Sequence, residues 1–365
     1  MTQSQTNPPQ IVARKVVDHH SLTLATPMKQ WKIHQRIPPV LLLTGPSGIG
    51  KRAVALFLSQ WISCKESGLS SPSDSAMPCG HCVSCVRFLS GNEVDFLEIK
   101  PDAGEDSESN YSSLKIDQFR KLKEKMGYST HENLHKVILI SQADRLTVQA
   151  ANSVLKLLEE TPKGWIFLLT ATDATLLLPT LVSRCQTLRL KPFSREKLEE
   201  LLALSEIPQE KRKICATLAQ GSWDRALSFA GEDLWEQRKL ICQFLKEPGK
   251  NLQAVLDWTS TAPFHFDILL DLLEQTVSEF LIWLSLPSNT THSWSQSDCS
   301  DILLSQAKFT VNSLGGISQA RSFWLERMKD LSETRQRATV PVNRKILIQT
   351  VLLPWMATDS SGGKA

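Results

Sequence analysis

The sequence predicts an α/β core built on a parallel sheet, followed by a region made only of helices. Two observations support this prediction. From about residue 30 to residue 190, short apolar runs alternate with amphipathic helical patterns, which is typical of a doubly wound parallel sheet. After Pro192 the strand-like runs stop, and apolar residues recur only with the spacing of helices.

Four strands and two helices are predicted in the core. The strands are short, largely apolar runs of the kind buried in parallel sheets, at 40–44, 94–99, 136–141 and 165–170. Helices are predicted at 52–63 and 147–160, where apolar residues return every three or four positions. Beyond the core, the same spacing predicts helices at 195–204, 211–219, 224–230 and 234–245.

The chain has 365 residues, more than a single core usually holds, so several domains are expected. We place the core at residues 1–190, with an insertion at about 64–90. A small helical domain follows at 191–235, and a larger helical domain at 236–357. The final segment, 358–365, consists of small and polar residues and is predicted to be disordered.

Composition and charge exclude several classes of protein. Hydrophobic residues make up 41% and charged residues 22%, which is ordinary for a folded chain. The net charge of +3, from 41 basic and 38 acidic residues, is too small for a chain that binds nucleic acid along its whole length. No apolar run approaches the roughly 18 residues of a membrane helix, and the polar start lacks the apolar centre of a signal peptide. We therefore expect a cytoplasmic protein.

A glycine-rich segment, Gly45-Pro46-Ser47-Gly48-Ile49-Gly50-Lys51, lies between a predicted strand and a predicted helix, as a phosphate-binding P-loop does. Backbone amides and a helix N-terminus favour an anion there, and the lysine can reach the outer phosphates. One residue departs from the motif, because Arg52 stands where a serine or threonine would bind Mg²⁺. The predicted nucleotide-binding residues are Gly45, Ser47, Gly48, Gly50 and Lys51.

Two further positions lack the side chains that ATP hydrolysis requires. In P-loop ATPases the strand that ends here near residue 140 supplies an aspartate for Mg²⁺, and many families add a glutamate that positions water. Ser141 and Gln142 occupy these places, and Asp144 is interpreted as the start of a helix. We therefore expect a degenerate loop that binds ATP or ADP weakly or not at all and does not hydrolyse it.

Four of the eight cysteines cluster in the insertion, at Cys64, Cys79, Cys82 and Cys85. In a reducing compartment this spacing favours a metal site over disulfides. Four thiolates suit the tetrahedral coordination of structural Zn²⁺, and a closed set of four sulfurs leaves no open position for catalysis. His81 is a less favoured substitute ligand, and reduced thiols without a metal are the alternative.

Several segments, taken in order, resemble the AAA+ clamp-loader subunits of bacterial DNA polymerase III, and among them the delta-prime type. They lie between about residues 25 and 230, and the C-terminal third resembles the family only weakly. Taken alone, Arg184 would be explained as one partner of a surface ion pair. The segments that carry the resemblance are the P-loop, the four-cysteine insertion, Ala150–Pro162, Ser183-Arg184-Cys185 and Gly221–Leu227.

The resemblance implies an AAA+ P-loop core, a helical lid and an all-α collar that assembles a five-subunit ring. The implied partners are the gamma/tau and delta subunits, with the sliding clamp and primed DNA reached through the complex. It also implies that Arg184 is an arginine finger for the ATP of the neighbouring subunit, a task that suits a planar, permanently charged guanidinium. The expected function is a non-hydrolysing, delta-prime-type subunit within the DNA polymerase III holoenzyme, a DNA-directed DNA polymerase and nucleotidyltransferase.

Two alternatives stay open at this stage. The first is an ATP-hydrolysing motor subunit of the gamma/tau type in the same complex, against which Arg52, Ser141 and Gln142 argue. The second is an AAA+ adaptor outside replication. Only the specificity of the 150–162 and 183–185 segments disfavours the adaptor.

Overall fold

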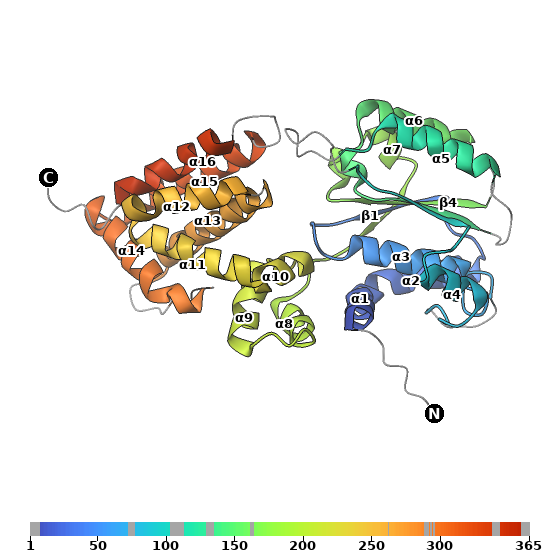
Figure 1. The fold of residues 1–365 in the computed structure, drawn as a ribbon, viewed down its shortest axis with the longest axis horizontal. Coiled ribbons are helices and arrows are strands. Elements are labelled where there is room, and N and C mark those ends of the chain that lie inside the picture. The colour runs from blue at the N-terminus through green and yellow to red at the C-terminus, as the bar shows by residue number, and fades with distance from the viewer. Residues whose placement is uncertain are drawn as a thin grey trace. The chain divides into compact units, whose positions relative to one another are not determined.

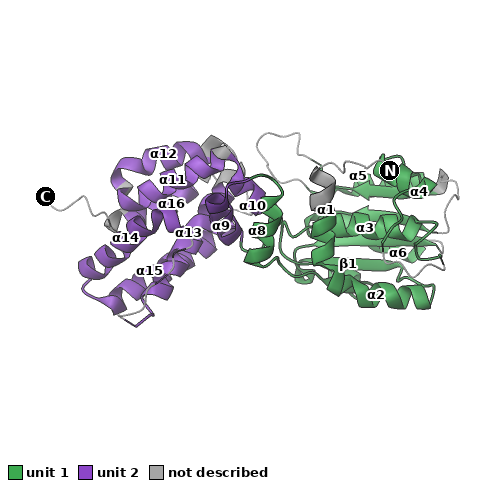
Figure 2. Cartoon of the chain, turned by 90° about the horizontal axis from the view of Figure 1, so that it is seen from below, with its two compact units in different colours: residues 1–206, 220–224 green, residues 207–219, 225–365 purple. Residues whose placement is uncertain are grey.

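The computed structural model describes residues 8–71, 77–102, 113–128, 135–160, 164–261, 263–287, 292, 294, 296–337 and 344–358. These residues form two compact units (Figure 2). The first unit comprises residues 1–206 with 220–224, and the second comprises 207–219 with 225–365.

The first unit is built on a five-stranded sheet whose strands all run parallel (Figure 1). Their order across the sheet is β2-β3-β4-β1-β5. The predicted α/β class with a parallel sheet is confirmed, and the four predicted strands agree with β1 to β4 within one or two residues at each end. The strands are β1 (Val40–Thr44), β2 (Phe96–Ile99), β3 (Lys136–Ile140), β4 (Trp165–Ala171) and β5 (Gln186–Arg189).

The fifth strand, β5, is not predicted from the sequence. It lies at one edge of the sheet and pairs with β1. Leu188 is its only buried residue, whereas every residue of β1, β3 and β4 is buried. An edge strand with a single buried side chain carries no apolar run, so the pattern that identifies the central strands is missing here.

Helices cover both faces of the sheet (Figure 1). Side chains alternate along each strand, so every second residue of β3 and β4 faces the same side. On one side, Ile138, Ile140, Phe167 and Leu169 form a core cluster with residues of α5 (Ile116–Tyr128), α6 (Val148–Glu160) and α7 (Pro179–Val182). On the other side lies α3 (Lys51–Ser63), next to α1 (Pro8–His19), α2 (Ser21–Ile33) and α4 (Val83–Leu89).

In the described residues after β5, all regular elements are helices, as predicted. The first unit ends with α8 (Arg195–Ala203), and α10 (Trp223–Ala230) begins at its final residues. The core of the second unit contains a chain of aromatic rings, with centroids 4.6 Å apart for Phe280 and Trp324 and 5.2 Å apart for Trp324 and Trp355. The other helices of this unit are α9 (Gln209–Leu218), α11 (Glu232–Lys246), α12 (Pro248–Thr261), α13 (Pro263–Trp283), α14 (Ser300–Ser313), α15 (Ile317–Arg337) and α16 (Arg344–Leu352).

The predicted domain boundaries at 190 and 235 stay predictions. Residues 191–235, expected to form a separate small domain, are shared between the two units. Residues 359–365 of the predicted tail lie outside the described residues. Within the described ranges, every helix is too short or too polar to cross a lipid bilayer.

Candidate functional site

The P-loop lies where the sequence predicts it, between the end of β1 and the start of α3. Gly45, Gly48 and Gly50 have φ angles of 147°, 73° and 86°, which residues with a side chain rarely adopt. Ser47 is exposed on the loop. The glycines therefore shape a turn that leads into the N-terminus of a 13-residue helix, and the free backbone amides of a helix N-terminus favour an anion.

The side chain of Lys51 bends back onto its own loop. Its Nζ donates hydrogen bonds to the carbonyl oxygens of Gly45 and Pro46, at 2.7 and 2.6 Å. Burial lowers the pKa of Lys51, and the nearby carboxylates of Asp144 and Asp224 act in the opposite direction. Two acidic side chains of the chain itself thus stabilise the charge of Lys51, at the position where a P-loop lysine would bind phosphates.

Residues far along the chain pack against the loop within the first unit. The carbonyl oxygen of Gly48 accepts hydrogen bonds from the amides of Trp223 and Asp224, at 2.8 and 3.2 Å. A Cβ atom added at Gly48 would lie 2.0 Å from Oγ of Ser222. The backbone of the loop is therefore covered at Gly48, and any larger residue there would displace the segment that begins at Ser222.

A bidentate ion pair stands where a P-loop ATPase would hold magnesium. Arg52 donates from Nε and Nη2 to the two carboxylate oxygens of Glu98, at 2.6 and 2.7 Å. Ser141, at the position of the magnesium-binding aspartate, donates to the same carboxylate at 3.0 Å. The two positions that should share a metal ion are thus joined through Glu98. Glu98 is not among the site residues predicted from the sequence. The one signal that could have identified it is its position as an acidic residue near the end of a predicted strand.

Glu98→Gln is expected to lower the free energy of unfolding by about 1–2 kcal/mol at pH 7, since Arg52 loses a charged partner. Burial alone would raise the pKa of Glu98, but hydrogen bonding and the charge of Arg52 outweigh burial and lower it. This contribution is present above the usual glutamate range and disappears as the pH falls through the lowered pKa. Urea unfolding at pH 7 and at about pH 3 checks the sign. An equal loss at both pH values would contradict it.

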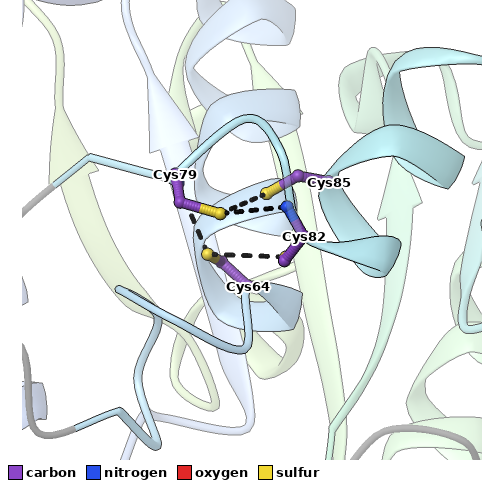
Figure 3. A group of neighbouring side chains, drawn as sticks. All are labelled: Cys64, Cys79, Cys82 and Cys85. Atoms are coloured by element: carbon purple, nitrogen blue, oxygen red, sulfur yellow. Dashed lines mark hydrogen bonds between the residues drawn. The ribbon is translucent and has the colours of Figure 1, made fainter.

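The four predicted cysteine ligands converge in the structure (Figure 3). Cys64 follows the end of α3, Cys79 and Cys82 lie in the loop before α4, and Cys85 lies in the first turn of α4. Their four sulfur atoms all lie within 4.8 Å of one another. Cys64, Cys82 and Cys85 are buried, and Cys79 is half-buried.

The geometry of the cluster fits a tetrahedral thiolate site. Zinc–sulfur bonds of about 2.3 Å place sulfur atoms about 3.8 Å apart. The Cys64 and Cys82 sulfurs lie 4.0 Å apart, and those of Cys79 and Cys85 lie 3.9 Å apart. Backbone amides point at two of the sulfurs: the Cys79 amide lies 3.4 Å from the Cys64 sulfur, and the Cys82 amide lies 3.3 Å from that of Cys79.

The protonation of these thiols also fits a cation-binding group. Burial opposes ionisation of Cys64, but hydrogen bonds from the Cys79 amide and from Ser67 lower its pKa to about 6. Burial raises the pKa of Cys85, so its thiolate needs a cation at neutral pH. His81, the less favoured substitute ligand, contacts Glu66 through Nε2 at 2.7 Å in a second, more exposed group with Cys79.

Arg184 follows α7 and is 43% exposed. Its Nη2 contacts Oε1 of Glu159 at 2.8 Å, and its Nη1 donates to the Thr180 carbonyl oxygen at 2.9 Å. Glu159 is itself 56% exposed. The ion pair expected from the isolated residue therefore exists, in a place open to solvent.

The three groups of predicted site residues are not brought together. The P-loop and the cysteine cluster lie at opposite ends of α3, whose 13 residues span about 20 Å. Arg184 lies before β5, at the amino ends of the strands, whereas the P-loop lies at the carboxyl end of β1. Each group must therefore act separately.

Comparison with known proteins identifies relatives for this arrangement. The family model described as "DNA polymerase III, delta subunit" matches residues 23–194. DNA polymerase III subunit delta' of Bacillus subtilis is 33% identical over 50% of this chain and 51% of its own length. DNA polymerase III subunit tau of Escherichia coli is 33% identical over 61% of this chain and 33% of its own length. Subunit delta' of Yersinia pestis is 29% identical over 88% of this chain and 90% of its own length.

A P-loop between the first strand and its helix, set in a five-stranded parallel sheet and followed by helices, defines a P-loop core of the AAA+ class. Within that class, the chain is similar to the delta-prime and tau subunits of bacterial DNA polymerase III, which are the relatives that the family model and the sequence comparisons identify. The chain matches about half the length of the Bacillus subtilis relative and a third of the Escherichia coli relative.

Proposed function

We propose that this chain is a delta-prime-type subunit of the bacterial DNA polymerase III clamp loader. It does not hydrolyse ATP, and it supplies Arg184 to a neighbouring ATPase subunit so that the sliding clamp is loaded onto primed DNA. The proposal that the chain does not hydrolyse ATP rests on the ion pair of Arg52 and Glu98, with Ser141 hydrogen-bonded to the same carboxylate.

Hydrolysis needs a metal ion held between the P-loop hydroxyl and the strand-end aspartate. In this chain a guanidinium fills that position and is fixed by two hydrogen bonds at 2.6 and 2.7 Å. Gln142 replaces the residue that would position water, and Lys51 already has two carbonyl partners. These observations support weak or absent nucleotide binding and no turnover.

The contact of Arg184 with Glu159 is compatible with a role toward a neighbouring subunit. Both side chains are well exposed, at 43% and 56%, and exposed ion pairs contribute only about 0–1 kcal/mol. A phosphate group that binds a planar guanidinium in two-point fashion offers a stronger interaction than this exposed pair. Arg184 can therefore exchange Glu159 for an incoming phosphate at small cost.

We propose Zn²⁺ as the ion of the cysteine cluster. Four sulfurs at tetrahedral spacing are typical of structural zinc, and a thiolate set disfavours magnesium or calcium, which prefer oxygen ligands. The ion would tie the loop from Cys79 to Cys85 to the end of α3, and it would fix α4 against that helix.

The proposed partners are gamma/tau and delta subunits in a five-subunit ring, with the sliding clamp and primed DNA reached through that complex. The helical residues from about 236 onward are proposed as the collar that assembles the ring. The family supports this assignment, since its named relatives are DNA polymerase III subunits delta' and tau. We expect the protein to act in the cytoplasm.

The isolated chain is expected to show no steady-state ATPase activity, with or without primed DNA and sliding clamp. Three missing groups remove several kcal/mol of transition-state stabilisation, each tenfold in rate being about 1.4 kcal/mol. Phosphate release, measured beside a tau-type subunit as positive control, checks this prediction. Turnover that DNA and clamp stimulate would instead favour the gamma/tau-type motor. A chain that fails to join clamp-loader subunits would favour the adaptor outside replication.

A further inference from the structure

A cavity of about 860 Å³ lies at the amino ends of β1 and β4. The P-loop lies at the opposite, carboxyl end of β1. Val40 and Trp165, the first residues of these two strands, both line it. Its volume lies in the range of small-molecule and cofactor sites, about 300–1,000 Å³. Other lining residues are Gln35, Arg36, His135 and Arg184.

The charge of this cavity has one sign. It holds two guanidinium groups, Arg36 and Arg184, and no acidic residue is among its described lining residues. Glu159 contacts Arg184, and Arg36 is exposed with no hydrogen-bonding partner for its side chain in the described part of the chain. The lining therefore carries excess positive charge, which attracts an anion.

One further observation, an unpaired buried polar atom, favours a ligand in the cavity. Nδ1 of His135 is buried and has no hydrogen-bonding partner among the described residues. Such unpaired buried polar atoms are few in folded proteins.

We propose that this cavity binds phosphate oxygens and that Arg36 is the second cation of the site, beside Arg184. The ligand class is a nucleoside triphosphate, because its adjacent phosphates offer the negative charge and the paired oxygens that guanidinium groups bind. The phosphates come either from a nucleotide held by a neighbouring subunit or from free nucleotide. The first source rests on the proposed function, in which Arg184 reaches a neighbour's ATP.

The first experiment measures ATPase activity of the reconstituted clamp loader against ATP concentration. Arg36→Ala is expected to lower kcat/KM about tenfold, and Arg36→Lys to keep part of the activity, since lysine retains the charge without the fork. Arg120→Ala is the matched control. Arg120 is an exposed, ion-paired arginine on α5 that does not line the cavity. Because Arg36 is exposed, the melting temperature of the variant chain should equal that of the wild type.

The second experiment identifies the source of the phosphates. Inorganic tripolyphosphate is titrated into the isolated chain by calorimetry. Binding that survives Lys51→Ala but is lost in Arg36→Ala would assign free nucleotide to the cavity. No binding by the isolated chain, together with the loss of kcat/KM in the complex, would assign the nucleotide of the neighbouring subunit.

Two results overturn this inference, and they are distinguishable. If Arg184→Ala lowers turnover of the complex while Arg36→Ala matches the wild type in both experiments, the second cation is refuted and the proposed function stands. If neither variant changes turnover and tripolyphosphate does not bind, the finger and the anion site both fall.

Discussion

Replacing Cys82 by alanine is expected to reduce the zinc content from one ion per chain to a small fraction of that value. Cys82 is buried within the cluster, with its sulfur 4.0 Å from that of Cys64, so its replacement removes one of the four sulfurs of the site. Structural zinc contributes about 10–16 kcal/mol of apparent binding energy in zinc-finger peptides at pH 7. Elemental analysis of protein purified in metal-stripped buffer measures the loss directly.

Two matched variants make the zinc result specific. Cys185→Ala removes a half-buried thiol outside the cluster, whose sulfur donates to the Leu181 carbonyl oxygen, and it should leave the zinc content unchanged. His81→Ala should also retain the ion, since His81 contacts Glu66. Full zinc in Cys82→Ala would contradict the four-thiolate assignment. Loss of zinc in His81→Ala would move the site to the second group of Glu66, Cys79 and His81.

The parts of the fold that the sequence predicts are those with a short-range signal. Strands β1, β3 and β4 are buried along their whole length, so each is a nearly continuous apolar run. The cysteine cluster is also local, because its four ligands fall within 22 residues of one another. The P-loop is recognisable because Gly45, Gly48 and Gly50 need positive φ angles that other residues resist.

The parts that the sequence does not predict depend on contacts between distant segments. Glu98 joins Arg52 and Ser141 across separations of 46 and 43 residues. Its role follows from the side-by-side pairing of β2 and β3, which no spacing along the chain encodes. The approach of Asp224 to Lys51 is similar, since it depends on the segment 220–224 returning to the first unit. Edge strand β5 lacks an apolar run altogether.

Arg184→Ala is expected to leave folding and ring assembly nearly intact while lowering the ATPase activity of the complex. The exposed pair with Glu159 stabilises the chain by at most about 1 kcal/mol, so its loss should barely change the melting temperature. An arginine finger is worth on the order of 10³–10⁵ at the site that it serves. Other sites in the ring would still turn over, so total ATPase should fall in part. Clamp loading, which needs coordinated sites, should fall further.

An arginine finger and a purely structural ion pair give opposite results when the melting temperature of the chain and the ATPase activity of the complex are measured on the same variants. Arg184→Lys retains the charge and can still pair with Glu159, so a structural role would be rescued. The activity of an arginine finger would not be rescued by lysine, because lysine cannot place a planar fork on phosphate oxygens. Arg120→Ala breaks another exposed pair of the same unit, with Asp117 at 3.0 Å, and controls for general loss of surface charge. Unchanged turnover of the complex together with a lowered melting temperature in Arg184→Ala would refute the finger. An arginine that acts on a neighbour's phosphate must change the ATPase rate of that neighbour, whatever it contributes to the stability of its own chain.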